Sequence, residues 1–536
     1  MNRTKQITDY LKARYAILVI ESFEEERALS EISEIAKALG HRLFVWNSTQ
    51  GVQINGSVAG EKTFDLKVAL DFCEERAKEE NSKSIFVFCD AHNYLTPSSN
   101  PVYRRRLRDF AINIRSRGYR SNCIIVAPSF EIATDLQKEI TLVDFPLPSR
   151  DEITGQVSKF ISSWQGNENI KIDLPSDAKE KLIDAALGLT ELEIDNSLSR
   201  SLVSSLSVNE NTVKDLLSEK KQIIRKTGIL EYIDSKVNLD DVGGLATLKK
   251  WLHLRSQCFG QAAQEFGVGT PKGLLLTGVP GCGKSLTAKC VSSSWNMPLL
   301  RLDMGKIFQG LVGSSESNIR SALRTAEAIS PCILWIDEIE KGLSGSSGGA
   351  SDGGVASRVF GTLLTWMQEK TAPVFVFATA NNIGSLPPEL LRKGRFDEIF
   401  FVDFPSTLER KKILEIHLKK LKRDPAKFDL DLLSALGGES NFGKDVVLSG
   451  AEIEAWVGES LIEAFSRRMS GSGDASDLTM ADFETTISRL VPMSKMRKEE
   501  FAKLREWANQ NAISASAMVA GQNGAETQVG GRQIDF

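Results

Sequence analysis

Residues 278–285 read Gly278-Val279-Pro280-Gly281-Cys282-Gly283-Lys284-Ser285. An apolar, strand-like run at 273–277 precedes this octapeptide, and a helix-like stretch at 286–294 follows it. The octapeptide fits the pattern G-x-x-x-x-G-K-[ST], in which glycines turn backbone N–H groups around phosphate oxygens and the lysine reaches the β- and γ-phosphates. The serine hydroxyl then ligates Mg²⁺, and the helix N-terminus adds a partial positive charge. This stretch therefore predicts a site for a nucleoside triphosphate with Mg²⁺.

A second apolar run, further along the chain, ends in two carboxylates: Ile333-Leu334-Trp335-Ile336-Asp337-Glu338. At such a strand end Asp337 would hold Mg²⁺ through water, and Glu338 would polarise the water that attacks the terminal phosphate. An acidic pair at the end of a strand is a solvated turn in most proteins. After a phosphate-binding loop, however, it predicts hydrolysis.

Short β-rich runs alternate with helix-like stretches in both halves of the chain. They lie at 16–21, 42–46, 85–89 and 123–127, and again at 273–277, 299–303, 333–337, 374–379 and 398–402. Strands that alternate with helices predict an α/β fold with a parallel sheet and right-handed crossovers. Residues 150–235 lack a strand-like run and read as almost all helix. The stretch from Ala512 onward is small, polar and glycine-rich, which predicts a tail.

The two halves of the chain also share short stretches of identical sequence. Val143-Asp144-Phe145-Pro146 recurs as Val402-Asp403-Phe404-Pro405. At the same separation along the chain, Leu189 matches Leu448, and Glu193-Ile194 matches Glu452-Ile453. A repeat of this kind predicts two copies of one unit, each an α/β domain followed by a small helical lid.

Residues 235–500 resemble an AAA-type ATPase module of the classical clade, a P-loop NTPase (AAA+) fold with a parallel sheet and a helical lid. Besides the two stretches above, the resemblance is carried by Asp241-Val242-Gly243-Gly244, Thr379-Ala380-Asn381, Leu391-Arg392-Lys393-Gly394-Arg395-Phe396-Asp397 and Leu448-Ser449-Gly450-Ala451-Glu452-Ile453. The resemblance implies an Mg²⁺-dependent ATPase that converts ATP to ADP and phosphate.

The resemblance also implies a role for each matching residue. Nucleotide binding falls to Asp241, Val242, Gly243, Gly278, Val279, Pro280, Gly281, Cys282, Gly283, Lys284, Ser285, Leu286, Gly450 and Ala451, and Mg²⁺ binding to Ser285 and Asp337. Catalysis falls to Glu338 as the base, Asn381 as the residue that orients the lytic water, and Arg392 and Arg395 as arginine fingers. Both arginines lie beyond the strand that carries Asn381, so they would act on the nucleotide of a neighbouring subunit in a ring. Family precedent makes that ring a hexamer.

The domain plan follows from the motifs and the repeat. We predict a degenerate ATPase-like α/β domain at 1–150, a helical lid or linker at 151–235, the AAA α/β core at 236–405, its helical lid at 406–505 and a flexible tail at 506–536. An α/β segment without a phosphate loop, then one ATPase module, then a final Gly-Arg-Gln-Ile-Asp-Phe resembles a group of AAA proteins encoded in cyanobacteria and algal plastid genomes. This closer resemblance implies the cyanobacterial cytoplasm or the plastid stroma, and a link to photosynthetic physiology by lineage.

The first copy lacks the chemistry of the second. At the place of the phosphate loop it reads Ile20-Glu21-Ser22-Phe23-Glu24-Glu25-Glu26, which has no glycine or lysine and whose carboxylates would repel a triphosphate. Its counterpart of the acidic strand end is Phe88-Cys89-Asp90-Ala91-His92, where core or turn use is the simpler reading of Asp90 and His92. We therefore expect residues 1–150 to bind no nucleotide and to serve ring building or client contact.

Composition narrows the partners. Lys and Arg number 66 against 70 Asp and Glu, so bulk charge gives no argument for nucleic acid or a membrane surface. No apolar run approaches the ~18 residues of a membrane span. The seven cysteines are scattered and the histidines number four, which predicts reduced core thiols rather than a zinc site.

Three functions stay open. The favoured one is an ATP-hydrolysing ring that remodels or regulates an unknown protein client. Two features differ from AAA proteins that thread polypeptides: Leu311 stands where those proteins carry an aromatic residue, and the stretch 344–354 is glycine-rich. Local remodelling therefore fits better than unfolding by threading. The second is a slow nucleotide-dependent switch or scaffold. The third, a nucleic-acid remodelling ATPase, rests only on the basic patch Tyr103-Arg104-Arg105-Arg106-Leu107-Arg108 with Arg115, Arg117 and Arg120.

Overall fold

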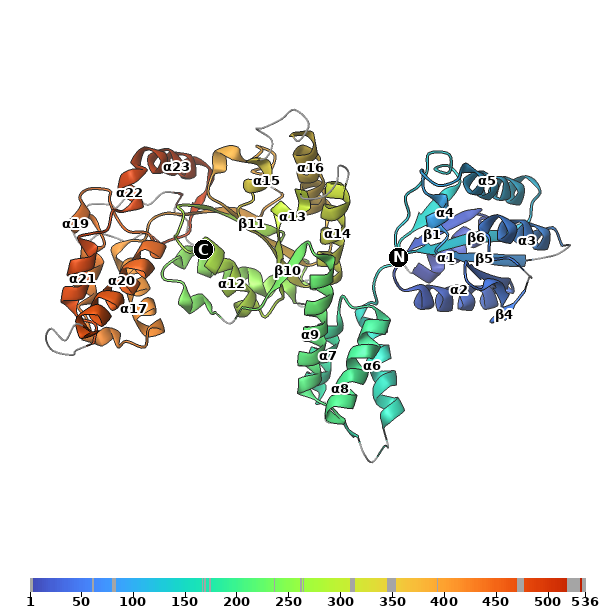
Figure 1. Ribbon diagram of the computed structural model, residues 1–536, viewed down its shortest axis with the longest axis horizontal. Helices are drawn as coiled ribbons and strands as arrows, with labels where there is room; N and C mark the ends of the chain where they lie inside the picture. Colours follow the sequence, from blue (N-terminus) through green and yellow to red (C-terminus); the bar gives the residue numbers. More distant parts are fainter. Residues whose placement is uncertain are drawn as a thin grey trace. The chain divides into compact units, whose positions relative to one another are not determined.

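The chain forms two compact units, Met1–Leu217 and Ser218–Phe536, called unit 1 and unit 2 below (Figure 1). The computed structural model describes residues 3–59, 62–79, 83–165, 167, 170–172, 175–235, 237–260, 263, 265–308, 314–344, 353–392, 394–469, 477–517 and 531–532. Leu311 and most of the glycine-rich stretch 344–354 lie outside these residues. No helix in the described part of the chain combines the length and apolar character that a bilayer crossing demands.

Unit 1 is built around a seven-stranded sheet with the order β4-β3-β2-β5-β6-β1-β7. The strands are β1 (Ile17–Glu21), β2 (Arg42–Asn47), β3 (Gly51–Ile54), β4 (Ser57–Val58), β5 (Lys83–Cys89), β6 (Arg120–Ala127) and β7 (Ile140–Val143). The five strands from β2 to β7 in this order are parallel, and β3 and β4 add an antiparallel edge. Successive residues of the strands enter opposite cores, as Val19 and Ile20 do, so both faces of the sheet are covered.

Helices complete unit 1. The sheet is accompanied by α1 (Arg3–Lys12), α2 (Glu25–Leu39), α3 (Leu66–Lys78), α4 (His92–Leu95) and α5 (Pro101–Ser116). The helical part contains α6 (Arg150–Trp164), α7 (Ser176–Ala186), α8 (Glu191–Ser205) and a parallel pair of two-residue strands, β8 (Lys171–Ile172) and β9 (Ser207–Val208). Capping boxes begin two of these helices, Ser149 with Glu152 at α6 and Thr190 with Glu193 at α8. Helix α9 (Glu210–Thr227) begins in unit 1 and ends in unit 2.

Unit 2 holds a second seven-stranded sheet, with the order β10-β12-β13-β14-β11-β15-β16. The strands are β10 (Leu230–Ile233), β11 (Gly273–Gly278), β12 (Leu299–Leu302), β13 (Cys332–Ile336), β14 (Val374–Ala380), β15 (Glu398–Val402) and β16 (Ile513–Ser514). Strand β10 is the antiparallel edge of this otherwise parallel sheet. The structure thus differs from the prediction that 150–235 contains no strand, because this range holds the short pair β8 and β9 as well as β10. Leu230 of β10 is buried against the core of unit 2 and pairs with Leu302.

The rest of unit 2 is helical. Its α/β part carries α10 (Ala246–Ser256), α12 (Lys284–Trp295), α13 (Met304–Phe308), α14 (Ser314–Ala328), α15 (Lys341–Ser344) and α16 (Gly353–Glu369). The lid contains α17 (Thr407–Lys420), α18 (Leu430–Leu436), α19 (Glu439–Phe442), α20 (Gly450–Met469) and α21 (Met480–Ile487), and α22 (Met493–Met496) and α23 (Lys498–Asn511) follow it (Figure 1). The lid has its own core, in which the Trp456 indole N–H donates to the Phe483 carbonyl.

The two parallel sheets share one topology. In each, the first strand lies between the fourth and the fifth, and the third and second strands follow outward: β2-β5-β6-β1-β7 in unit 1 and β12-β13-β14-β11-β15 in unit 2. The Val143 and Val402 of the repeated tetrapeptides both end the fifth strand. The predicted fold class, an AAA α/β domain preceded by a related α/β domain, is therefore confirmed.

The C-terminal stretch differs from the predicted tail at its described residues. Ile513 pairs with Phe400 as strand β16 and is buried, as are Ala512 and Ala515. The Ala515 N–H donates to the Phe401 carbonyl at 2.8 Å, and the Leu248 N–H donates to the Ala515 carbonyl at 3.1 Å. A strand of two residues is too short to show periodicity in the sequence.

We expect Ile513→Ala to lower the free energy of unfolding of unit 2 by about 2–5 kcal/mol, because it opens a cavity in a closed core. Urea unfolding of the full chain checks this, with Glu506→Ala, an exposed position on α23, as the control. If both variants unfold at the wild-type urea concentration, β16 does not contribute to the core as described.

Candidate nucleotide-binding site

The loop between β11 and α12 needs its glycines. Gly278, Gly281 and Gly283 have φ values of 137°, 74° and 84°, which lie in the region that favours glycine. A Cβ on Gly278 would stand 2.0 Å from the Val402 carbonyl oxygen, and one on Gly281 would stand 3.0 Å from the Cβ of Ala451. The loop therefore passes close to β15 and to the lid, and larger residues would push it away from both.

Lys284 lies buried at the start of α12. Its ammonium donates to the carbonyls of Gly278 and Val279, both at 2.8 Å. These bonds connect the start of α12 to the start of the loop. Burial lowers the pKa of Lys284 to about 8, although the nearby carboxylates of Glu340, Glu338 and Asp337 favour the charged form. A phosphate placed beside this ammonium would favour the charged form further.

Ser285 and Asp337 meet across the gap between α12 and β13. The Ser285 hydroxyl donates to Oδ1 of Asp337 at 3.0 Å, and the Thr379 hydroxyl donates to the same oxygen at 2.6 Å. Thr379 Oγ1 also accepts the N–H of Glu338 at 2.9 Å, which ties the ends of β13 and β14 together. One hydroxyl and one carboxylate suit Mg²⁺, which keeps several waters and takes its other ligands from substrate phosphates. The residues present therefore fit the predicted ion.

Glu338 and Asn381 come together at the same edge of the sheet. The Asn381 side-chain amide donates to Oε1 of Glu338 at 2.8 Å, and Oε2 of Glu338 forms an ion pair with the ammonium of Lys341. The backbone N–H of Asn381 donates to Oε1 of Glu340 at 2.9 Å. Glu338 has a φ of 50°, so the chain turns sharply here and turns its carboxylate toward Asn381. This pair can hold and polarise a water molecule.

These groups border a cavity of about 570 Å³, a size typical of ligand sites. Its lining includes the sequence-predicted Asp241, Val242, Gly243, Pro280, Gly281, Cys282, Gly283, Lys284, Ser285, Leu286, Asp337, Glu338, Asn381, Gly450 and Ala451. Gly278 and Val279 do not line it, but they anchor Lys284 from below. Most of the site that the motifs predict is therefore one cavity.

The lid closes the other end of the cavity. The Ala451 N–H, in the first turn of α20, donates to the Gly281 carbonyl at 2.8 Å. A Cβ on Gly243 would stand 2.6 Å from Ile413, so the segment before α10 lies close against α17. Backbone and apolar side chains of this kind suit a flat aromatic base.

Sequence reasoning missed part of this wall. The additional lining residues are Leu245, Thr379, Val402, Asp403, Pro405, Glu409, Ile413, Ile416, His417, Lys420, Glu454 and Ser516. Ile413, Ile416, His417 and Lys420 share one face of α17 at helical spacing, which is a pattern the sequence does show. Ser516, whose hydroxyl donates to Glu409 at 2.7 Å, carries no such signal.

The predicted arginine fingers stand apart from this cavity. Arg392 and Arg395 lie in the segment between β14 and β15; Arg392 is exposed and Arg395 half-buried. Neither lines the cavity of its own chain. The Nε of Arg395 is buried and has no hydrogen-bond partner among the described residues.

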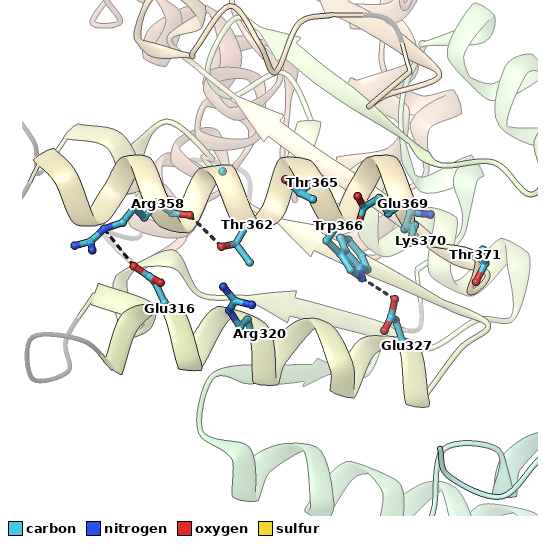
Figure 2. A pocket seen from close by; sticks show the side chains of 11 residues that line it. Glu316, Arg320, Glu327, Arg358, Thr362, Thr365, Trp366, Glu369, Lys370 and Thr371 are labelled. Atoms are coloured by element: carbon cyan, nitrogen blue, oxygen red, sulfur yellow. Dashed lines mark hydrogen bonds and ion pairs between the residues drawn. The ribbon is translucent and has the colours of Figure 1, made fainter. Parts of the chain in front are cut away.

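A second hollow, of about 640 Å³, lies between α14 and α16 (Figure 2). Two pairs form among its polar groups: Arg358 with Glu316 at 3.2 Å, and the Trp366 indole N–H with Glu327 at 2.8 Å. None of the sequence-predicted site residues lines it. Of these two cavities, only the first is therefore lined by the residues that the sequence motifs predict.

ATP affinity should depend on pH through Lys284. The lysine is charged below its pKa of about 8, and a bound triphosphate favours the charged form, so binding takes up a proton above that pH. Titration calorimetry between pH 7 and 9.5 should show ATP affinity falling toward tenfold per pH unit above pH 8. Lys284→Arg stays charged over this range and should show no such fall. An equally flat profile for the wild type would contradict the lowered pKa.

Comparison with known families agrees with this geometry. Residues 274–404 match the family described as ATPase family associated with various cellular activities (AAA). Residues 3–145 match the SpoVK-like AAA ATPase N-terminal domain, and residues 151–227 match the SpoVK-like AAA ATPase second domain.

Individual relatives match nearly the whole chain. The chain is 37% identical to the AAA domain-containing protein ycf46 of Guillardia theta over 96% of each chain. It is 38% identical to the ycf46 protein of Pyropia yezoensis over 95% of this chain and 98% of the relative. A partial match is the ATP-dependent zinc metalloprotease FtsH 2 of Bdellovibrio bacteriovorus, 32% identical over 50% of this chain and 42% of the relative. The chain thus belongs to the AAA ATPase family, with a SpoVK-like N-terminal part, and is similar over almost its full length to the ycf46 proteins.

Proposed function

We propose that this protein is an Mg²⁺-dependent ATPase that works as a ring, by family precedent a hexamer, and locally remodels a protein partner. The observation that carries the proposal is the hydrogen bond of 2.8 Å between Asn381 and Glu338, beside the Ser285–Asp337 pair in the same cavity. A base, a water-orienting amide and a metal-binding pair in one cavity are what triphosphate hydrolysis requires.

The residues divide the work as follows. The glycine-rich loop and Lys284 hold the phosphates, and the wall formed by Val242, Ile416 and Ala451 holds the adenine ring of the nucleotide. Mg²⁺, held by Ser285 and through water by Asp337, would neutralise charge on the phosphates. Glu338 accepts the proton of the attacking water while Asn381 keeps that water in line. The water oxygen bonds to the terminal phosphorus, the bond to the bridging oxygen breaks, and ADP and phosphate leave.

The ring is supported by the position of the arginines. Arg392 and Arg395 do not border their own cavity, and among the described residues the Nε of Arg395 has no hydrogen-bond acceptor. An arginine supplied by a neighbouring chain can raise phosphoryl-transfer rates by ~10³–10⁵. A neighbour in a ring would bring such an arginine to each site.

A slow switch or scaffold is the second candidate, and one contact favours it. The Glu338 carboxylate is engaged on both oxygens, by Asn381 and by Lys341, so the base is occupied in this state. Turnover would then wait until a neighbour or a client draws Lys341 away. ATP turnover measured with and without added partner distinguishes a constitutive ATPase from such a switch.

Nucleic acid is the weaker candidate, because five of the seven arginines of the basic patch are paired with carboxylates; Arg117, which donates to the Tyr119 hydroxyl, and Arg120 lie outside those pairs. The arginines of the basic patch on α5 are paired within unit 1: Arg104 with Asp135, Arg105 with Asp109, Arg106 with Asp71 and Glu74, and Arg108 and Arg115 with Glu139. Guanidinium groups that already hold carboxylates leave little field for phosphates. A protein client is therefore the better proposal.

The relatives support a setting and a kind of client. Near full-length matches in Guillardia theta and Pyropia yezoensis support the plastid stroma or the cyanobacterial cytoplasm, and through that lineage a link to photosynthetic physiology. The partial match to an ATP-dependent protease supports work on proteins.

Glu338→Gln should bind ATP within about threefold of wild type and lose at least 10²-fold in turnover, because phosphate contacts remain while the base is gone. Lys284→Ala should lose binding itself. Binding of a fluorescent ATP analogue and phosphate release measure the two properties separately. Near wild-type turnover by Glu338→Gln would show that another group is the base.

Subunits with complementary defects should rescue one another. Arg395→Ala and Glu338→Gln chains, each inactive alone, should regain phosphate release when mixed, because some interfaces then join an intact Glu338 site to an intact arginine. Subunit exchange is verified separately, for example by energy transfer between labelled chains. No recovery in rings that have demonstrably mixed would place Arg395 in its own chain's site or outside the chemistry.

A further inference from the structure

Unit 1 carries a cluster of charged side chains, three of them buried (Glu24, Arg27 and Glu31), where unit 2 carries its phosphate loop. Three residues, Ser22, Phe23 and Glu24, separate β1 from α2, whereas five residues separate β11 from α12. The shorter connection leaves no room for a loop that could surround a phosphate. In its place stand two guanidinium and four carboxylate groups, the ionic latch: Arg3, Glu24, Arg27, Glu31, Glu152 and Glu191.

Glu24 is the central acid of the ionic latch. Its side chain is 5% exposed, and Oε1 accepts the backbone N–H of Glu191, the first residue of α8, at 2.8 Å. Oε2 pairs with the guanidinium of Arg27. In unit 2 the first turn of the lid helix α20 makes the matching contact, from the Ala451 N–H to the Gly281 carbonyl. A side-chain carboxylate thus does in unit 1 what the phosphate loop does in unit 2.

Arg27 extends the connection to the other helix of the lid. Its side chain is 6% exposed, donates to the Pro146 carbonyl at 2.9 Å and stands 3.4 Å from Glu152 in the first turn of α6. The ring of Phe145, from the repeated tetrapeptide, lies 4.8 Å from the Arg27 guanidinium and 4.4 Å from that of Arg3. Arg3 also bonds Glu152 at 3.0 Å. The sheet and the helices α6 and α8 are therefore joined through these charges.

The electrostatics of the ionic latch exclude a nucleotide. Four carboxylates against two guanidinium groups leave an excess of negative charge, which repels a triphosphate. Burial alone would raise the pKa of Glu152, but the Ser149 hydrogen bonds and the two arginines lower it to about 2, so this acid stays charged. A buried carboxylate is costly unless it is paired and hydrogen-bonded, and Glu24 is both.

We propose that Glu24 is a built-in ligand, whose carboxylate stands where a nucleotide would join sheet and lid, and holds α8 to the sheet of unit 1 with no nucleotide bound. Unit 1 then keeps one conformation while unit 2 passes through its ATP cycle. The observation behind this is the Glu24–Glu191 hydrogen bond at the lid contact, and it does not depend on the residues proposed for catalysis.

Hydrogen exchange of the full-length chain, followed by mass spectrometry on peptides that cover 189–198, tests the proposal. In the wild type, amides at the start of α8 should exchange slowly, and saturating Mg-ATP should leave them unchanged. Glu24→Ala should speed their exchange by about tenfold or more, because the N–H of Glu191 loses a charged acceptor. Arg27→Met, which keeps the apolar stem, should act in the same direction.

Two controls keep the result readable. Glu26→Ala removes an exposed carboxylate from the same turn of α2 and should leave α8 unchanged. Peptides from the buried strand β5 report whether unit 1 is still folded, and they should exchange as in the wild type. Two results would overturn the proposal. The first is a folded Glu24→Ala protein whose α8 amides exchange as slowly as in the wild type. The second is a Lys284→Ala protein, with Glu24 intact, in which Mg-ATP slows the exchange of the α8 amides.

Discussion

The close approach of the chain at Gly278 and Gly281 is the constraint on which the site of unit 2 depends. Any residue with a Cβ at these positions would prevent the loop from lying against both the Val402 carbonyl and the first turn of α20. That approach aims the N-terminus of α12 at the cavity and leaves Lys284 its backbone partners. The lid, the sheet and the phosphate loop therefore meet at two residues that have no side chain.

The two units show how one strand order can carry opposite electrostatics. In unit 2 a lysine, a helix N-terminus and backbone groups surround the space after the first strand, so an anion is needed to balance them. In unit 1 the same space is filled by Glu24 and bounded by Arg27, and the balance is internal. The number of residues between strand and helix decides which of these is built, because a three-residue connection cannot turn around a phosphate.

Local patterns predicted the chemistry, and long-range pairing escaped them. The phosphate loop, Asp337 and Glu338 were readable because each lies within a few residues of a buried strand, and the meeting of Asn381 with Glu338 follows from parallel strands ending at one edge. Strand β10 and strand β16 were missed because each is short and is defined by a partner far along the chain. The pairing of Arg106 with Asp71 and Glu74 was equally hidden, since it joins two helices that the sequence separates.

The position of Ser516 has a consequence for how the site comes into being. Ser516 follows strand β16 and lines the same cavity as the loop residues 280–285, so parts distant in the sequence must meet before the cavity is complete. Long-range closure of this kind is slow compared with helix formation. A chain cut or terminated before residue 516 would lack this part of the cavity wall. The complete cavity, and with it the binding of a substrate there, therefore requires that the chain extends to residue 516.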